Sequence, residues 1–160
     1  MTIKAGDKVP SATLKVMTED GPANATTEEL FGSGRVVMFS VPGAFTPTCS
    51  ARHLPGFVDR AADIKAKGVD RIVCVAVNDV FVMNAWGKSA NVQDKIIMAA
   101  DGNGEFTRAL GLELDASGFG MGKRGKRFAM ITQDGVVTSI SVEAPGEFKV
   151  SSAEFVLGQL

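Results

Sequence analysis

The stretch Val36-Val37-Met38-Phe39-Ser40-Val41-Pro42-Gly43-Ala44-Phe45-Thr46-Pro47-Thr48-Cys49 joins a strand pattern to a helix pattern. Residues 36–41 are mostly apolar without helical spacing, which is typical of a strand buried on both faces. The Pro-Gly pair that follows ends this strand. Thr46 is expected to be the N-cap of the next helix, because its hydroxyl can accept a hydrogen bond from an unpaired backbone N–H. Pro47 suits the first helical position.

Cys49 falls at about the third position of this helix, where unpaired amides and the helix dipole favour an anion. Its sulfur should therefore be biased towards the thiolate, which is the nucleophilic form. The alternative is an inert packing cysteine. Such a residue normally lies within an apolar stripe, whereas the neighbours of Cys49 are Thr48, Ser50, Arg52 and His53. We therefore expect a reactive thiol at the junction.

Length and composition narrow the classes of protein that fit. A chain of 160 residues is expected to form one domain, 1–160, with a core large enough to need no staples. The 17 basic and 18 acidic residues give a net charge of −1, which argues against nucleic-acid binding. The start of the chain has no apolar leader and no later run is long enough for a membrane span, so we expect a soluble, cytoplasmic protein. Two cysteines and one histidine are too few for a disulfide scaffold or a zinc site, and no metal or cofactor is expected.

The rest of the first half alternates between strand and helix patterns. Residues 12–16 suit an edge strand or a hairpin arm. Thr26 and Glu29 form a capping-box pair that opens a short helix. The helix after the cysteine loop is expected to be kinked at Pro55 and to end before a glycine at position 68. The apolar run 71–78 then makes a second buried strand, and the strand–helix–strand succession predicts a parallel pair.

The second half begins with a helix capped by Asn78 or Asp79, followed by a strand over 95–100 and a short helix over 105–110. The glycine-rich segment 111–125 is expected to be a loop. A hairpin over 128–142 and a C-terminal helix follow. This succession is the one expected of an α/β protein with a thioredoxin-like fold, in which helices flank a central mixed β-sheet that carries an N-terminal extension.

The cysteine loop also resembles a known motif. Pro42-x-x-x-Thr46-x-x-Cys49, followed by His53-Leu54-Pro55-Gly56-Phe57, is similar to the peroxidatic signature of peroxiredoxins, and its longer form resembles the type II branch, or peroxiredoxin 5 group. The resemblance implies a thiol-dependent peroxidase for hydrogen peroxide and alkyl hydroperoxides, in which the cysteine becomes a sulfenic acid. It spans nearly the whole chain.

The resemblance also implies roles for individual residues. Thr46 and an arginine would bind the peroxide beside Cys49, while Pro42 and Gly43 would shape the substrate pocket. The similarity of Lys-Arg-Phe-Ala-Met assigns the arginine role to Arg127, with Arg124 as second choice. An arginine suits this role because its guanidinium offers a fork of donors to both thiolate and peroxide.

The sequence leaves open which thiol would reduce the sulfenic acid. Some type II members carry a resolving cysteine near the C-terminus, but residues 148–153 contain none. Cys74 is the other cysteine, as in plant members, yet it lies between Val73 and Val75 in a strand whose apolar pattern predicts burial. We therefore expect a packed Cys74 and an exposed sulfenic acid reduced by glutathione, with or without glutaredoxin, or by thioredoxin. The alternative function is a peroxide sensor or chaperone that uses the cysteine stoichiometrically.

Two further features carry expectations. His53 lies one helical turn from Cys49 and could act as its base. We instead expect it to order the pocket or to form a hydrogen bond with the backbone. The aromatic residues Phe45, Phe81 and Phe119 fall in exposed-looking segments. Because related type II enzymes pair through the end that carries the cysteine loop, we expect a homodimer in which a partner covers these rings.

Overall fold

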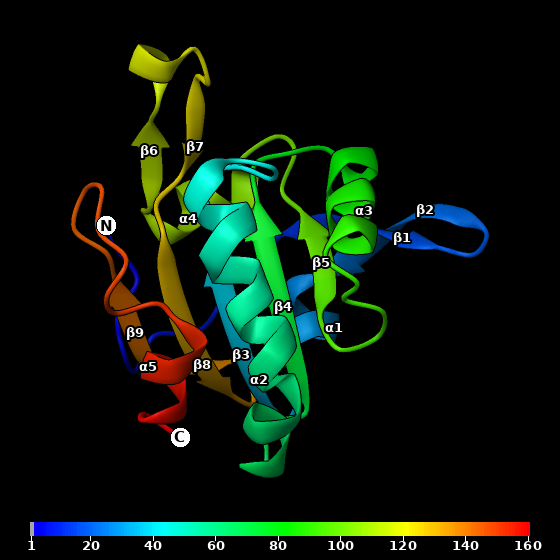
Figure 1. The fold of residues 1–160 in the computed structure, drawn as a ribbon. Helices are drawn as coiled ribbons and strands as arrows, with labels where there is room; N and C mark the ends of the chain where they lie inside the picture. Colours follow the sequence, from blue (N-terminus) through cyan, green and yellow to red (C-terminus); the bar gives the residue numbers. More distant parts are fainter. Residues whose placement is uncertain (1) are drawn as a thin grey trace.

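A seven-stranded mixed sheet in the order β2-β1-β5-β4-β3-β8-β9 forms the centre of the computed structural model, which describes residues 2–160 (Figure 1). β3, β4 and β5 are parallel, whereas β8 runs antiparallel to β3 and β1 antiparallel to β5. The predicted mixed sheet and its parallel unit are therefore confirmed. The strands are β1 (Thr13–Thr18), β2 (Gly21–Thr26), β3 (Arg35–Ser40), β4 (Arg71–Ala76), β5 (Ile97–Ala100), β8 (Phe128–Gln133) and β9 (Val136–Val142).

Helices cover both faces of this sheet. α2, α3 and α5 pack on one face, and α1 and α4 lie on the other (Figure 1). The central strands are apolar on both sides because each face needs its own core: Val37 and Phe39 of β3 belong to the first core, Val36 and Met38 to the second. The helices are α1 (Thr27–Phe31), α2 (Leu54–Ala66), α3 (Val80–Ser89), α4 (Glu105–Leu110) and α5 (Ala153–Leu157).

Several helix ends lie where the sequence predicts them. Thr26 and Glu29 form both halves of the capping box of α1. The Asp79 carboxylate accepts from the N–H of Val82 and caps α3. Gly68 follows α2 with φ = 89°, the left-handed conformation that favours glycine after a helix. No helix among residues 2–160 is both long and apolar enough to cross a bilayer.

The helix after the cysteine loop is interrupted close to Pro55, as expected. Residues Cys49–His53 form a π-helical turn in which the N–H of Leu54 donates to the carbonyl of Cys49. Proline has no N–H to continue the α-helical ladder at this point, so the wider turn relieves the mismatch. The regular helix α2 begins only at Leu54.

The segment 111–125 is not the loop that its glycines suggest. β6 (Glu113–Asp115) and β7 (Lys123–Gly125) pair as an antiparallel hairpin that projects from the sheet (Figure 1). Three of the segment's five glycines, Gly118, Gly120 and Gly122, lie at the tip between the two strands, where Gly120 and Gly122 adopt positive φ. Likewise, the N-terminal arm is a full hairpin, because β2 pairs with β1.

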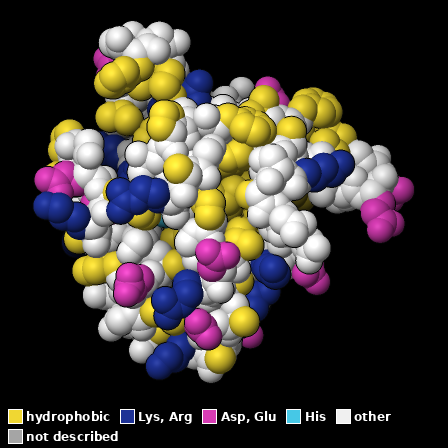
Figure 2. Space-filling model, in the orientation of Figure 1, with side chains coloured by type: hydrophobic (Ala, Val, Ile, Leu, Met, Phe, Trp, Pro, Cys, Tyr) yellow, Lys and Arg dark blue, Asp and Glu magenta, His cyan; other side chains and the backbone are white. Residues whose placement is uncertain are grey.

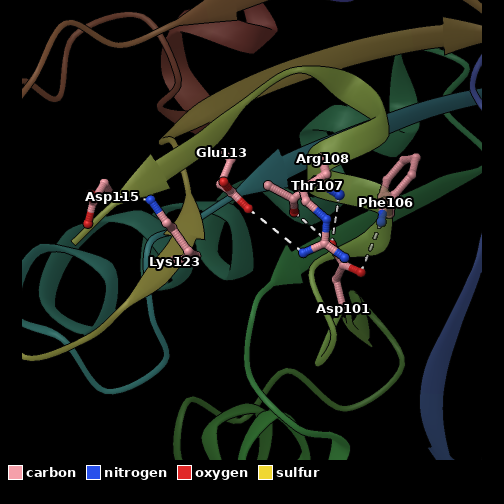
Figure 3. A network of polar contacts seen from close by, with 7 residues as sticks. All are labelled: Asp101, Phe106, Thr107, Arg108, Glu113, Asp115 and Lys123. Carbon is pink, nitrogen blue, oxygen red and sulfur yellow. Dashed lines mark hydrogen bonds and ion pairs between the residues drawn. The ribbon is translucent and has the colours of Figure 1, made fainter. Parts of the chain in front are cut away.

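Polar contacts fix the base of this hairpin beside α4 (Figure 3). The buried Asp101 carboxylate accepts from the N–H of Phe106 and from the N–H and hydroxyl of Thr107, which holds the first turn of α4. Two ion pairs follow, from Arg108 to Glu113 at 3.8 Å and from Lys123 to Asp115 at 3.2 Å. These contacts hold the hairpin in place, and with it the segment that carries Arg124 in β7 and Arg127 just before β8.

Candidate active site

The cysteine loop is pinned to the carboxyl end of β4. The N–H of Val41 donates to the carbonyl of Val75 at 3.2 Å, and the N–H of Ala44 donates to the side chain of Asn78 at 2.9 Å. Phe45 has φ = 63°, an uncommon left-handed conformation for a residue other than glycine. These contacts turn the chain sharply between β3 and the helix that carries Cys49.

Thr46 corrects one detail of the sequence analysis. Its backbone carbonyl accepts from the N–H of Ser50 at 2.9 Å, so the helix begins where predicted. Its hydroxyl, however, donates to the carbonyl of Gly43 at 2.6 Å instead of accepting from a helix N–H. A threonine hydroxyl can satisfy a nearby carbonyl in a turn as readily as it caps a helix. Because its proton is engaged, the Thr46 oxygen can act on a bound molecule as an acceptor.

The Cys49 sulfur meets the guanidinium of Arg127. Nη2 of Arg127 donates to Sγ at 3.0 Å, and Cys49 is 0% exposed. A permanently charged donor at this distance stabilises negative charge on the sulfur. The expectation that the sulfur is exposed is therefore wrong for this conformation, because the π-helical turn packs it into the core between α2 and the sheet.

Backbone contacts place Arg127 at this point. Arg127 immediately precedes β8, whose first residue, Phe128, pairs with Ser40 at the end of β3. The Ser40 hydroxyl donates to the carbonyl of Lys126 at 2.9 Å, and the N–H of Glu143 donates to the carbonyl of Arg127 at 2.9 Å. The pairing of β3 with β8 thus brings the arginine beside a cysteine 78 residues earlier in the chain.

Arg124 occupies a different place. Its Nε donates to the carbonyl of Met121 at 2.9 Å, and Nη1 donates to the carbonyl of Pro42 at 3.4 Å. It also packs on Gly43, where an added Cβ would lie 3.0 Å from Nη1 and 3.1 Å from the side chain of Thr46. Of the two candidate arginines, Arg127 contacts the sulfur and Arg124 lines the loop beside it.

His53 is buried and neutral. Burial, followed by the charge of Arg127, lowers the pKa of His53 to about 3. Its Nε2–H donates to the carbonyl of Ser151 at 2.8 Å, so the unprotonated Nδ1 accepts from Nη1 of Arg127 at 2.7 Å. Both nitrogens are therefore engaged away from the sulfur. This contradicts a role as base for Cys49 and confirms the expected bond to the backbone.

Cys74 lies on β4 opposite Phe39 of β3, and it shares a core with Cys49. Burial raises the pKa of the Cys74 thiol well above its ordinary value, and the nearby Cys49 sulfur raises it further. Both cysteines are free thiols. The predicted packing of Cys74 in an apolar strand is confirmed.

Sequence reasoning missed several residues around the site. Phe148 packs its ring edge-on against His53, with the guanidinium carbon of Arg52 4.7 Å above the Phe148 ring centroid. Trp86 of α3 donates from its indole N–H to the hydroxyl of Ser50 at 3.0 Å, which ties the cysteine turn to α3. No local pattern in the sequence marks these contacts.

The chemistry available here is that of a sulfur nucleophile with a fixed cationic donor. Among residues 2–160, no group of three or more histidine, cysteine or acidic side chains is placed to hold a metal ion. The fold and the contact between cysteine and arginine place the chain among the thiol-dependent oxidoreductases with a thioredoxin-like fold.

Comparison with known proteins defines the family more closely. Residues 4–157 match the Redoxin family. The chain is 48% identical over 159 residues to Peroxiredoxin-2B of Arabidopsis thaliana, covering 99% of this chain and 98% of that protein. It is 44% identical over 163 residues to the hybrid peroxiredoxin hyPrx5 of Haemophilus influenzae, covering all of this chain and 67% of that protein. The structure of reduced Prx3 from Vibrio vulnificus in complex with H₂O₂ superimposes with a TM-score of 0.95 at 52% identity, covering 99% of each chain.

The chain therefore belongs to the peroxiredoxins, in their type II branch, and it is a thiol-dependent peroxidase.

Proposed function

We propose that the protein reduces hydrogen peroxide and alkyl hydroperoxides through a sulfenic acid at Cys49, which an external thiol recycles. The contact of 3.0 Å between Arg127 and the Cys49 sulfur carries this proposal, because it places a fixed positive donor where a thiolate would attack a peroxide. The similar Vibrio vulnificus protein, solved in its reduced form with H₂O₂, supports hydrogen peroxide as a substrate.

In the proposed reaction, the Cys49 thiolate attacks one peroxide oxygen, so that an S–O bond forms and the O–O bond breaks. The sulfur is oxidised by two electrons, and the departing oxygen takes up a proton and leaves as water or alcohol. Arg127 and the N–H of Cys49 donate to the peroxide oxygens, and Thr46 accepts from the peroxide O–H. Pro42 and Gly43 form the wall of the pocket.

Recycling requires the sulfur to become accessible. A thiol such as glutathione would attack the sulfenic acid to give a mixed disulfide and water, and a second thiol would then release Cys49. Because Cys49 is buried, these two thiol-exchange steps require local opening of the π-helical turn Cys49–His53. Cys74 is buried and the pKa of its thiol is raised, so an external thiol is favoured over Cys74 as the resolving group.

A panel of reductants tests the proposal. Purified protein is supplied with hydrogen peroxide or an alkyl hydroperoxide and with glutathione, glutathione plus glutaredoxin, or thioredoxin plus its reductase. We expect repeated turnover with at least one of them and none with Cys49→Ser, because a serine hydroxyl is barely ionised at neutral pH. A single stoichiometric oxidation without turnover would instead indicate the alternative, a peroxide sensor or chaperone.

The exposed aromatic residues support a homodimer. Phe45, Phe81 and Phe119 are 54%, 63% and 86% exposed, as the sequence predicts. Figure 2 shows hydrophobic side chains gathered on the projecting hairpin and on the upper end of the molecule. Such rings are commonly covered by a partner. We also propose a cytoplasmic location, supported by two free thiols that a reducing compartment would preserve; cell fractionation tests it.

A further inference from the structure

The loop that follows β9 is closed by one buried carboxylate. Glu143 is 8% exposed, and its carboxylate accepts from the N–H groups of Lys149, Val150 and Ser151 at 2.8 to 2.9 Å. The Ser151 hydroxyl is a fourth donor at 2.6 Å. Burial alone raises the pKa of Glu143, but these hydrogen bonds together lower it below its usual value. An ionised carboxylate with four donors holds the loop over 143–151 in one conformation.

This loop presents a carbonyl to the active site. Ser151, which is itself fully buried, accepts from Nε2–H of His53 at 2.8 Å. Because Nε2 is the protonated nitrogen, Nδ1 is left as an acceptor, and the orientation of the imidazole follows from the position of the Ser151 carbonyl.

His53 then holds one prong of the guanidinium. Nη1 of Arg127 donates to Nδ1 of His53 at 2.7 Å, while Nη2 donates to Sγ of Cys49 at 3.0 Å. The two prongs belong to one rigid plane, so a bond that fixes Nη1 also fixes the direction of Nη2. Without an acceptor at Nδ1, the long arginine side chain would regain rotamers that point away from the sulfur.

Aromatic rings lock the imidazole in place. The ring centroids of Phe39 and Phe148 lie 4.9 Å from that of His53, and the Phe57 centroid lies 5.7 Å away. His53 is fully buried by this packing, so its side of the contact with Arg127 is shielded from water, which strengthens a hydrogen bond to a charged donor.

We propose that Glu143, Ser151 and His53 are positioning residues for the peroxidase reaction, acting as a relay that aims Nη2 of Arg127 at the Cys49 sulfur. The relay rests on the proposed function, since it acts on the step in which Cys49 attacks the peroxide. None of the three touches the sulfur in the described contacts, so each acts through Arg127.

A double-mutant cycle separates this relay from a general packing role. His53→Gln places an amide near Nε2 and removes the acceptor at Nδ1, and we expect it to slow the reaction with peroxide at least about tenfold. In an Arg127→Lys background the same substitution should cost less than about twofold. Equal losses in the two backgrounds would overturn the relay.

Two more variants sharpen the test. His53→Asn keeps an acceptor near the position of Nδ1, so it should lose less activity than His53→Gln; equal losses would contradict the role of Nδ1. Glu143→Gln should slow the reaction, whereas Glu147→Gln, the same change on the same loop at a residue paired only with Lys149, should not. A Glu143→Gln variant that folds and reacts as fast as the wild type would remove Glu143 from the relay.

The thiolate gives a readout independent of turnover. Ultraviolet absorbance of the thiolate at neutral pH should fall in His53→Gln and Glu143→Gln but not in Glu147→Gln, because a misaligned guanidinium stabilises the anion less. A protein without peroxidase turnover would refute the proposed function and still allow this test. Unchanged thiolate absorbance in all three variants would overturn the relay itself.

Discussion

Nη2 of Arg127 lies 3.0 Å from the sulfur of Cys49, although the two residues are 78 positions apart. The contact follows from the pairing of β3 with β8, since Cys49 follows the carboxyl end of one strand and Arg127 precedes the amino end of the other. Antiparallel strands bring these two ends to the same edge of the sheet. The register of β3 and β8 thus determines the contact between Arg127 and Cys49.

Arg127→Lys should slow the reaction with peroxide by more than tenfold, which corresponds to at least about 1.4 kcal/mol of transition-state stabilisation. A lysine keeps the charge but has no fork with which to bond His53 and the sulfur together. Stopped-flow measurement of the peroxide rate constant checks this. Arg124→Lys is the matched comparison and should lose less, because Arg124 bonds the Pro42 carbonyl. A larger loss for Arg124→Lys would reverse the assignment.

The buried imidazole predicts a specific dependence of stability on pH. His53 is the one histidine of the chain, and its pKa in the folded protein is about 3, against about 6.5 when unfolded. Below the unfolded pKa, the unfolded chain takes up a proton that the folded one does not. Stability is therefore full above pH 6.5 and is lost as pH falls, by about 2 kcal/mol between pH 7 and pH 5.

Urea unfolding at the two pH values measures this loss. The comparison is best made in a Cys49→Ser background, so that oxidation of the active-site thiol does not affect the unfolding curves. Adding His53→Asn should abolish most of the difference between pH 7 and pH 5, even if it lowers stability at both. A pH effect of the same size without the histidine would show that other groups cause it.

Local patterns predicted much of the fold. Residues close together in the sequence determine each correctly predicted feature. These features are the buried strands over 36–41 and 71–78, the capping box at Thr26 and the cap at Asp79. The hairpin β6–β7 was missed because its glycine-rich tip masks two short strands. Periodicity has little power over segments of three residues.

The supporting contacts of the site could not be predicted in the same way. The bond between His53 and the Ser151 carbonyl joins residues 98 positions apart, and a backbone carbonyl leaves no mark in a sequence. The burial of Cys49 was also missed. This burial depends on how the π-helical turn packs against the sheet. Such tertiary packing cannot be predicted from the first few residues of the helix.

Phe119 gives a test of the proposed homodimer. It lies at the tip of the projecting hairpin and is 86% exposed, so Phe119→Ser should not disturb the monomer fold. We expect the wild type to sediment as a dimer at tens of micromolar and the variant to dissociate more readily, because apolar surface buried at the interface is lost. A monomeric wild type under these conditions would contradict the proposal.

Cys74 provides the last prediction, because packing and catalytic roles give opposite results. Cys74 is fully buried in β4, and its thiol has a raised pKa, so it is a poor attacking group at neutral pH. Cys74→Ser places a hydroxyl in an apolar strand interior and should lower the free energy of unfolding by about 1 to 3 kcal/mol. Turnover with an external thiol should persist, and intact mass after peroxide treatment should show oxygen addition at Cys49.

A resolving role for Cys74 would instead give an intramolecular disulfide in the wild type, seen as the loss of two hydrogens. The Cys74→Ser variant would then lack thioredoxin-supported turnover. Finding that disulfide as the main product would mean that both the turn at Cys49–His53 and the strand β4 open during catalysis, since both sulfurs are buried in the structure.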